Sequence, residues 1–229
     1  MAPRPGATTV LRSYELSEAL MRKAKKAKPQ LDLAHDNRSP AMRLDLYQPR
    51  QLDRGRALWV ELLWLIAQLL VLTSPISCNA LRRFVLTLFG AKIGHKVTIK
   101  PGVRVKFPWR LEIGNNCWIG EGVWLDNLAN ITIGNHCCIS QGAYLCTGSH
   151  NWRSIEFELI VKPILLEDGV WLAARSTVGP GVAAGQGAVL SLGSVATQDL
   201  APYQIHQGVP ALPIKAREVI ASNRAERSS

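Results

Sequence analysis

The sequence predicts an all-β solenoid, in which short parallel strands form the sides of a stacked, three-sided coil. Aliphatic residues recur every six positions, as in Ile93, Ile99 and Val105, and this step continues through residues 93–195. The pair Ile-Gly also recurs every twenty positions, at residues 93, 113 and 133. Neither a helix nor a β-hairpin has a period of six, whereas stacked repeats do. Each strand would point one aliphatic residue inward and pair with neighbouring coils roughly 4.8 Å away.

The blocks of twenty residues each hold three hexads and two extra residues, which are Leu111-Glu112 in one block and Ile131-Thr132 in the next. A small residue, often glycine, follows many of the aliphatic positions and suits tight corners where a side chain would clash. Residues 151–159 interrupt the repeat, and the step of six returns after them. We therefore assign residues 92–200 to the solenoid and expect residues 151–159 to form a loop that leaves it.

The regions around the solenoid differ from it in composition. Residues 1–56 are basic and contain few large apolar side chains, so we expect a largely irregular arm. Residues 57–91 are apolar and helical in character, and a second helix over residues 79–89 would cap the open end of the core. Residues 201–229 are expected to form an exit segment followed by a short C-terminal helix over residues 211–225.

The first apolar helix, over residues 57–72, has two possible surroundings. It is apolar on nearly all sides except at Glu61 and Gln68, and Pro75 ends it. It falls short of the roughly 20 residues that span a bilayer. One interpretation packs the helix against the solenoid or a neighbouring subunit. The other lays it in the membrane interface as a peripheral contact, assisted by nearby arginines, and the sequence leaves both open.

The chain of 229 residues carries a formal net charge of +10, much of it outside the repeat. Nucleic acid is one candidate partner for such a charge, but no aromatic-rich basic strand, recognition helix or zinc finger accompanies it. Anionic lipid or an acidic sugar substrate explains the charge equally well. We therefore expect no nucleic-acid partner.

The five cysteines form no Cys-x-x-Cys pairs, and three of them occupy hexad positions where small side chains recur. We interpret them as packed thiols in a reducing compartment. The first thirty residues lack the apolar core of a cleavable signal peptide. These features predict a cytoplasmic protein, which would lie at the inner face of the membrane if residues 57–72 contact lipid.

Three consecutive segments carry a resemblance to a known family. They are Leu125-Asp126-Asn127, the run Cys-Ile-Ser-Gln-Gly-Ala-Tyr at residues 138–144 and the run Leu-Cys-Thr-Gly-Ser-His-Asn at residues 145–151. Over roughly residues 80–217 the chain resembles the hexapeptide-repeat acetyltransferases, most closely the colanic-acid-type O-acetyltransferases. The resemblance implies a left-handed parallel β-helix, acetyl-CoA as co-substrate and a homotrimer. It also implies transfer of acetyl to a saccharide hydroxyl in exopolysaccharide or capsule biosynthesis, on a free or lipid-linked acceptor.

His150 is the candidate catalytic residue. It stands at the end of the third coil, immediately before the predicted loop, and insertions on one face of a solenoid often mark its working face. Acetyl transfer from a thioester to an alcohol needs a base near neutral pH, and imidazole suits that task. In the resembled family the histidine of this motif removes the proton of the acceptor hydroxyl, which attacks the acetyl carbonyl directly. A purely structural histidine is the alternative.

The period of twenty predicts which residues surround His150. Positions 110, 130 and 150 should stack at one corner, which would place Asn130 one rung and Arg110 two rungs from His150. Glu156 and Glu158, in the loop, are alternatives for orienting the imidazole.

Asp126 and Asn127 should likewise lie one rung from residues 146 and 147. We predict that Asp126, Asn127 and Asn130 bind the acceptor hydroxyl or orient the histidine, and the resemblance favours Asp126. Trp152, in the loop, is a further acceptor-binding candidate. Polar corner residues that merely face water are the alternative for each.

For acetyl-CoA the resemblance points to the coils after the loop. Backbone amides along an edge of the β-helix would bind the extended pantetheine arm. Gln198 stands where the family typically has lysine, so Lys215 or Arg217 would supply the charge near the phosphates. The predicted co-substrate-binding residues are Trp171, Ala174, Leu192, Thr197, Gln198 and Lys215.

Other chemistries lack their motifs. The sequence has neither a GxxxxGK[ST] phosphate loop nor a GxSxG nucleophile elbow. The γ-type carbonic anhydrases share the β-helix but need three histidine ligands, and the histidines here lack close paired spacing, so we expect no metal. Two alternatives remain: acetylation of a small acceptor such as serine, an amino sugar or an antibiotic, and a non-catalytic β-helix scaffold.

Overall fold

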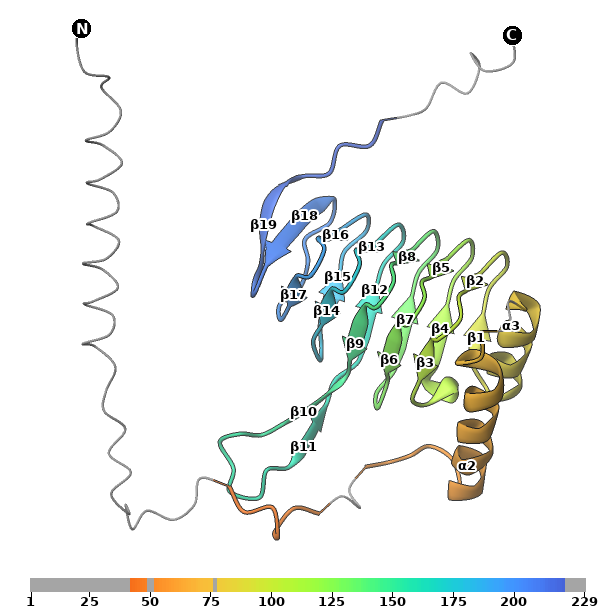
Figure 1. The fold of residues 1–229 in the computed structure, drawn as a ribbon. Coiled ribbons are helices and arrows are strands. Elements are labelled where there is room, and N and C mark those ends of the chain that lie inside the picture. Colours follow the sequence, from red (N-terminus) through yellow and green to blue (C-terminus); the bar gives the residue numbers. More distant parts are fainter. Residues whose placement is uncertain (1–41, 49–51, 76–77, 221–229) are drawn as a thin grey trace, which may run out of the picture. The chain divides into compact units, whose positions relative to one another are not determined.

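Three parallel sheets form the sides of a β-helix in the computed structural model, which describes residues 42–48, 52–75 and 78–220 (Figure 1). Successive strands enter the three sheets in turn, so that each coil adds one strand to each sheet. The predicted parallel β-helix is confirmed. Most of the predicted N-terminal arm, residues 1–41 and 49–51, lies outside the described residues.

The strands distribute over sheets that we name A, B and C. Sheet A contains β1 (Lys92–Ile93), β4 (Leu111–Ile113), β7 (Ile131–Ile133), β12 (Ile164–Leu166) and β15 (Ala183–Ala184). Sheet B contains β2 (Thr98–Ile99), β5 (Trp118–Ile119), β8 (Cys138–Ile139), β13 (Trp171–Leu172), β16 (Val189–Leu190), β18 (Gln204–Gly208) and β19 (Ala211–Ala216). Sheet C contains β3 (Arg104–Val105), β6 (Trp124–Asp126), β9 (Tyr144–Cys146), β14 (Thr177–Val178) and β17 (Val195–Ala196).

The register of the strands follows the spacing of the sequence. Ile93 lies opposite Ile113, and Ile113 lies opposite Ile133, each pair twenty residues apart. After the interruption Ile133 lies opposite Leu166, and Leu166 lies opposite Ala184. From Ile113 onward these inward side chains are buried in one continuous core. Truncating one such leucine to alanine typically costs about 2–5 kcal/mol of stability.

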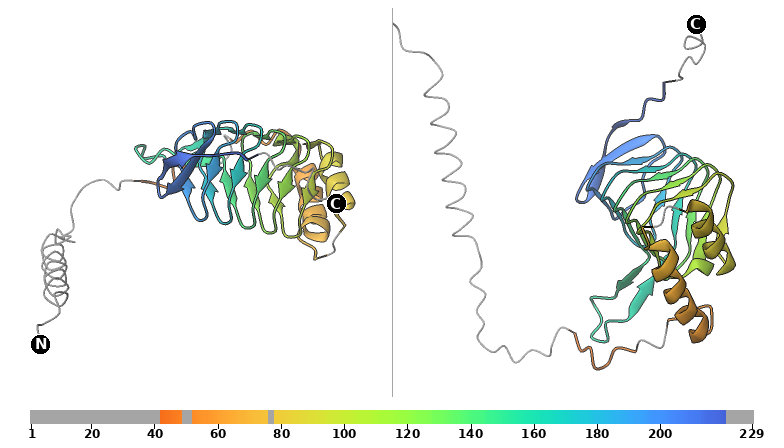
Figure 2. Two further views of the ribbon diagram at one scale, coloured as in Figure 1. Left: turned by 90° about the horizontal axis from the view of Figure 1, so that it is seen from above. Right: turned by 45° about the vertical axis from the view of Figure 1, so that its right-hand side comes forward.

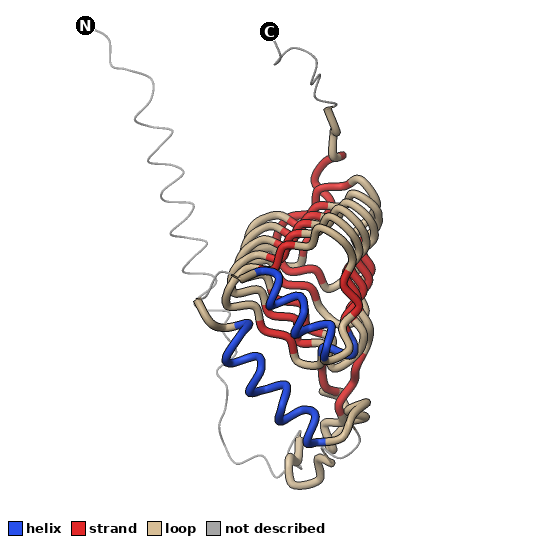
Figure 3. Tube along the Cα trace, turned by 90° about the vertical axis from the view of Figure 1, so that its right-hand side faces the viewer, coloured by secondary structure: helices blue, strands red, loops and turns tan. Residues whose placement is uncertain are grey.

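Two helices lie across the end of the solenoid beside the first coil, as Figure 3 shows. The first, α2 (Leu58–Ala67), continues as the π-helical turn η2 (Gln68–Leu72), and α3 (Asn79–Leu88) follows. Trp64 and Leu72 from the first helix and Leu86 from the second are buried in the core. The second helix thus covers the open end of the core, as the sequence predicts. None of the helices in the described part of the chain is long and apolar enough to cross a membrane.

Polar side chains of these helices form hydrogen bonds with the free backbone groups of the first coil. The indole Nε1 of Trp64 donates to the carbonyl of Val105 at 2.9 Å, and the Val105 N–H donates to Gln68 Oε1 at 2.6 Å. Asn79 Oδ1 likewise accepts from the Ile99 N–H at 2.8 Å. An exposed sheet edge invites pairing with another chain, and these bonds protect the edges of sheets B and C.

The predicted C-terminal helix is wrong over the residues that the structure describes. Residues 211–216 instead form β19, which pairs antiparallel with β18 at the far end of the solenoid (Figure 2). The free edge of β18 offers unpaired backbone groups, and a strand satisfies them whereas a helix would not. Pro213 lacks an N–H and is tolerated because β19 is an edge strand. The remainder of the predicted helix beyond residue 220 lies outside the described residues.

Candidate active site

The third coil opens between Thr147 and Lys162 into a hairpin that projects from the solenoid (Figure 1). Its strands are β10 (Gly148–His150) and β11 (Leu159–Val161), which pair antiparallel. The Lys162 N–H donates to the Thr147 carbonyl at 2.9 Å, which closes the base of the hairpin. The chain therefore leaves the solenoid earlier than the predicted loop at residues 151–159, because the residues flanking the loop pair with each other.

The hairpin itself holds the imidazole of His150. The Nδ1 atom lies 2.8 Å from the Phe157 carbonyl oxygen, and the two rings stack with centroids 4.2 Å apart. Tyr47 packs edge-on against the imidazole, with centroids 5.5 Å apart. A carbonyl oxygen only accepts, so we assign the proton to Nδ1 and the lone pair to Nε2. Nothing among the described residues hydrogen-bonds Nε2, which leaves this atom able to accept a proton.

Neither of the two residues that orient the imidazole could be predicted from the sequence. Phe157 acts through its carbonyl, a group that every residue carries, so the identity of the residue does not mark the contact. Tyr47 lies far from His150 along the chain, and no spacing rule connects them. The carbonyl of Phe157 takes the place that was predicted for Glu156 or Glu158.

The predicted stack of positions 110, 130 and 150 is wrong at its third member. Arg110 and Asn130 lie on adjacent rungs, because the strands that follow them pair in register. On the next rung Pro163, and not His150, lies beside Asn130. Ile164 pairs in register with Ile131, and its N–H donates to the Asn130 carbonyl at 3.0 Å. The hairpin has carried His150 away from this corner, so Asn130 does not stack beneath it.

Asn127 has a structural task that excludes the predicted acceptor contact. Its side chain is fully buried. Oδ1 accepts from the Phe107 N–H at 2.9 Å, and Nδ2 donates to the Phe107 carbonyl at 2.6 Å. Both polar atoms of the amide are thus used to close the turn between two coils, and neither is available to a substrate.

Asp126 reaches the outer surface of sheet C beside the base of the hairpin. It pairs in register with Cys146, as the sequence predicts, and its Oδ2 accepts from the Tyr144 hydroxyl at 3.1 Å. Burial, a hydrogen bond with Cys146 and the nearby charge of Asp126 raise the pKa of Tyr144 well above its usual range. The phenol therefore stays protonated through the neutral range and donates to the carboxylate.

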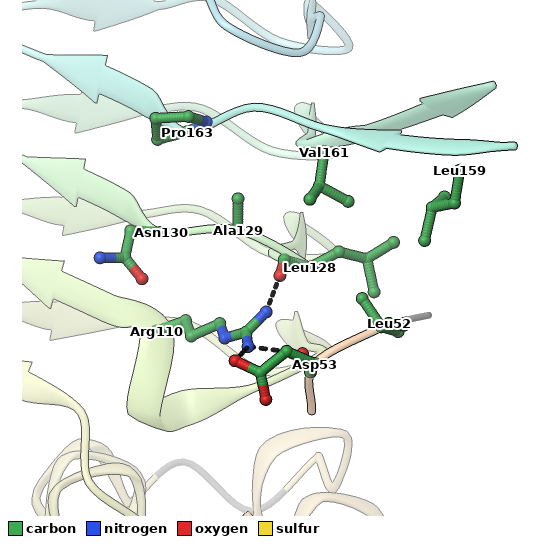
Figure 4. A pocket seen from close by; sticks show the side chains of 9 residues that line it. All are labelled: Leu52, Asp53, Arg110, Leu128, Ala129, Asn130, Leu159, Val161 and Pro163. Carbon is green, nitrogen blue, oxygen red and sulfur yellow. Dashed lines mark hydrogen bonds and ion pairs between the residues drawn. The ribbon is translucent and has the colours of Figure 1, made fainter. Parts of the chain in front are cut away.

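A pocket of about 570 Å³ opens at the base of the hairpin (Figure 4). Its walls are mostly apolar, and Arg110, Asp53 and Asn130 provide its polar groups. The guanidinium of Arg110 donates to the Leu128 carbonyl and forms an ion pair with Asp53 at 3.3 Å. The pocket thus combines apolar walls with a fixed charge pair.

His150 and this pocket share one face of the hairpin. His150 lies opposite Leu159, and Gly148 lies opposite Val161. Residues directly opposed on neighbouring strands point their side chains to the same face. Leu159 and Val161 line the pocket, whereas His150 stands farther along the hairpin and does not line it. The imidazole of His150 therefore lies on the pocket side of the hairpin, beyond the pocket itself.

Trp152 lies in the loop of the hairpin, two residues after His150. Its side chain is 73% exposed, and Arg153 lies over the ring at 4.9 Å from the centroid. Among the described residues, no ring contact or hydrogen bond joins Trp152 to His150. Its predicted role in acceptor binding stays a prediction.

The residues predicted for acetyl-CoA do not gather into one cluster. Trp171 faces outward from sheet B, where its indole donates to Ser140 Oγ at 3.0 Å. Ala174 and Leu192 lie on adjacent rungs of the corner between sheets B and C, since the N–H of residue 193 donates to the Ala174 carbonyl at 3.0 Å. Leu192 is exposed at this corner.

Thr197 and Gln198 are exposed at a different corner, the one between sheets C and A that follows β17. Lys215 is exposed on β19. Arg217, the alternative cation, directs its Nη1 at two carbonyls of the solenoid, 2.8 and 2.9 Å away. Lys215 is therefore the less constrained of the two cations.

The part of the chain that the structure describes contains no group of three or more histidine, cysteine, aspartate or glutamate side chains placed to bind a metal. His206 is buried, and its Nε2 accepts from the Ala201 N–H at 3.3 Å. Cys117 and Cys137 are buried in the core, as expected of packed thiols.

No protein-family model matches the chain. It is 40% identical over 169 residues to the putative colanic acid biosynthesis acetyltransferase WcaF of Escherichia coli K12, a match that covers 74% of this chain and 93% of that protein. It is also similar to the structure of a hexapeptide-repeat acetyltransferase of Vibrio cholerae complexed with acetyl-CoA, with a TM-score of 0.66, 26% identity and coverage of 73% and 93%. A galactoside acetyltransferase in complex with coenzyme A shares the fold, with a TM-score of 0.63, 21% identity and coverage of 70% and 82%.

The β-helix and the similarity to these acetyltransferases identify an acyltransferase of the hexapeptide-repeat class. The chain belongs to the hexapeptide-repeat acetyltransferase superfamily and is similar to a colanic acid acetyltransferase within it. The motifs at residues 125–127 and 138–151 predicted this family, and the prediction of an acyltransferase is confirmed.

Proposed function

We propose that this acetyltransferase moves acetyl from acetyl-CoA to a saccharide hydroxyl during exopolysaccharide or capsule biosynthesis, with His150 as the general base. One observation carries the proposal: Nδ1 of His150 lies 2.8 Å from the Phe157 carbonyl, which leaves Nε2 as the proton acceptor. Similarity to an acetyltransferase of colanic acid biosynthesis supports the choice of a saccharide acceptor.

In this mechanism Nε2 of His150 removes the hydroxyl proton while the acceptor oxygen forms its bond to the acetyl carbonyl carbon. The carbon–sulfur bond then breaks, and the imidazolium returns the proton to the departing sulfur, which leaves as the thiol. A neutral imidazole remains for the next turnover. Negative charge developing on the carbonyl oxygen needs a hydrogen-bond donor, and a backbone N–H of the later coils would serve.

The acceptor would occupy the pocket at the base of the hairpin with the part of the molecule that does not react. Arg110 and Asn130 offer hydrogen bonds to hydroxyl groups, and the apolar walls would contact the faces of a sugar ring. The shared face of His150 and Leu159 supports this arrangement, because a hydroxyl of the acceptor could then extend along the hairpin to Nε2. Asp126 is the further candidate for orienting the acceptor.

The coils after the hairpin offer groups that fit acetyl-CoA. The corner that carries Ala174 and Leu192 has accessible backbone, since a Cβ added at residue 193 would meet no atom within 4 Å. An extended pantetheine arm needs such a backbone edge for its amides. Lys215 would contact a phosphate group, and Trp171, Thr197 and Gln198 are the remaining candidates.

The enzyme would act as a homotrimer. In a single chain the hairpin extends beyond the coils (Figure 1), and Trp152 in its loop is exposed, which suits contact with a neighbouring copy. One copy would then supply His150 while the adjacent copy completes the pocket for acetyl-CoA. We place the trimer in the cytoplasm at the inner face of the membrane, where a lipid-linked acceptor would be presented.

Acetylation of a small acceptor is the second candidate function. The chain is 30% identical over 109 residues to a probable macrolide acetyltransferase of Lysinibacillus sphaericus, a match that covers 47% of this chain and 61% of that protein. The apolar walls of the pocket at the hairpin base would also suit such a compound.

Thiol release from acetyl-CoA tests both candidates, using a panel of sugars and small acceptors. The variant His150→Ala should lose about 100-fold or more in turnover, as expected for removal of a general base. His136→Asn is the matched control, because His136 occupies a corner with φ of 57° and Asn116 adopts the same conformation one rung away. Equal turnover by the wild type and His150→Ala would contradict the mechanism, and turnover with small acceptors alone would favour the second candidate.

A further inference from the structure

The two helices at the first coil leave a large apolar surface uncovered. The side chains of Leu58, Trp59 and Leu62 in α2 and of Leu69 in η2 are each more than 60% exposed, and so are Phe84 and Leu88 in α3. On α2 and η2 these residues form one stripe, since the helix turns by about 100° per residue and Trp64 on the opposite side is buried. Both helices lie across the end of the solenoid (Figure 3).

The polar residues within this helix point toward the protein rather than outward. Glu61 forms an ion pair with Arg54 at 2.5 Å, and its side chain is only 12% exposed. Gln68 uses its Oε1 to accept from the Val105 N–H. The two polar interruptions that the sequence shows are therefore absent from the outer stripe, and the apolar surface is continuous along the helix.

Charge distinguishes the first coil and its helices from the later coils of the solenoid. Residues 52–110 contain ten lysines and arginines against two aspartates and glutamates, a net charge of +8. Residues 111–220 contain five against nine, a net charge of −4. The first coil alone, residues 91–110, carries six lysines and arginines and no acidic residue. The apolar surface thus lies in a basic region, and Arg56, Lys96 and Lys106 are exposed there.

This combination fits an anionic bilayer better than a second copy of the chain. Basic residues close to an anionic membrane contribute about 1 kcal/mol each, and an amphipathic helix in the interface buries its apolar face among the lipids. A twofold contact between copies would bring the same surface of each together, and so place a net charge of +8 against another of +8. Such repulsion opposes a twofold interface through this surface.

We infer that the surface formed by α2, α3 and the first coil is a docking site for an anionic lipid bilayer. The long axis of α2 would lie in the plane of the interface, with Trp59, Leu62 and Leu69 among the lipids. The inference deepens the proposed function, because it names the surface through which the enzyme would approach a lipid-linked acceptor. It rests on that function only for the acceptor, since lipid binding is measured without turnover.

Co-sedimentation of the full chain with vesicles tests the inference. We expect binding to phosphatidylcholine vesicles that contain about one third phosphatidylglycerol, and weaker binding at high salt or to pure phosphatidylcholine. Leu69→Glu should reduce the partition coefficient on the anionic vesicles at least about 10-fold. Leu212→Glu is the matched control, because Leu212 is 59% exposed on β19 at the opposite end and should leave binding unchanged.

A second variant tests the charge separately from the apolar stripe. Lys96→Glu combined with Lys106→Glu should weaken binding to the anionic vesicles and leave the melting temperature and the apolar stripe unchanged. Wild-type binding by Leu69→Glu, or no binding by the wild type, would overturn the inference. A smaller oligomer of Leu69→Glu in solution would overturn it as well, because the surface would then be a subunit interface. Thiol release by Leu69→Glu with a water-soluble acceptor should equal that of the wild type, so failure of docking and failure of the proposed activity are distinguished.

Discussion

Two corners of the same solenoid are built in different ways. At the corner between sheets A and B the turns are closed by a ladder of side chains: the Asn115 N–H donates to Asn135 Oδ1 at 2.8 Å, and the Asn135 N–H donates to Asp168 Oδ1 at 2.7 Å. At the corner between sheets C and A the first coil makes a 3-10 turn at residues 108–110, the second is closed by Asn127 and the third opens into the hairpin.

The difference shows where a β-helix tolerates a functional insertion. At the first corner adjacent rungs are so close that a Cβ on Gly134 would lie 2.4 Å from Asp168 Oδ1. At the second corner the contact between Lys162 and the Thr147 carbonyl bridges the gap, and Leu166 still pairs in register with Ile133. The coil therefore continues in register after the hairpin. The candidate base belongs to the corner where close packing between rungs constrains the chain least.

Removing the hairpin should have the largest effect on activity and a small effect on the fold. We expect replacement of residues 149–160 by a short glycine link to reduce acetyl transfer by about 100-fold or more. Because the base of the hairpin is already closed, the melting temperature should change by less than about 4 °C. Thiol release and thermal unfolding measure the two effects. Unfolding of the shortened chain would show that the second corner tolerates a change no better than the first.

Adding a methyl group at the tight corner should have the opposite result. Gly134→Ala forces atoms apart in a packed backbone and should destabilise the fold by about 1–3 kcal/mol, measured by urea unfolding. Gly179→Ala is the matched control at the other corner, where the nearest atom to an added Cβ is 3.2 Å away, and should cost less than about 1 kcal/mol. Equal losses for the two variants would remove the distinction between the corners.

Asn127 sharpens the comparison within the second corner. Asn127→Ala leaves the buried N–H and carbonyl of Phe107 without their partners and should cost about 1–3 kcal/mol of stability. The KM for the acceptor should stay unchanged, because the amide does not face the substrate. A raised KM with unchanged stability would instead restore the role in acceptor binding that the sequence suggested.

The smallest expected effect is a pH dependence at the first corner. Hydrogen bonds from Asn135 lower the pKa of Asp168 below its ordinary value. The stabilisation is complete above the unfolded-state pKa of about 3.9 and is lost as the pH falls below it, through the folded-state value. Asp168→Asn should flatten the dependence of stability on pH in that acidic window. Identical acid unfolding curves for the wild type and Asp168→Asn would contradict this assignment.

The sequence named His150 as the candidate base, which stays a prediction, and the surroundings expected for it were wrong. The motif that ends at residue 151 singled out His150, but the period of twenty placed it above Asn130. A period describes the chain only while it stays in the solenoid, and Gly148 already pairs with Val161 in the hairpin. The contacts of the imidazole with Phe157 and Tyr47 therefore lay beyond any repeat-based prediction.

The sequence by itself determined the β-helix, because one aliphatic residue in every six must be buried and only stacked coils bury them all. The tertiary structure alone decided which groups complete the edges: Gln68 and Asn79 at the first coil, and β19 in place of a helix at the last. The physical reason is that burial of apolar side chains follows a local period, whereas a free backbone N–H or carbonyl accepts any partner that the fold brings within reach. The same rule holds for His150, because the partner of its Nδ1 is a backbone carbonyl seven residues away and not a carboxylate.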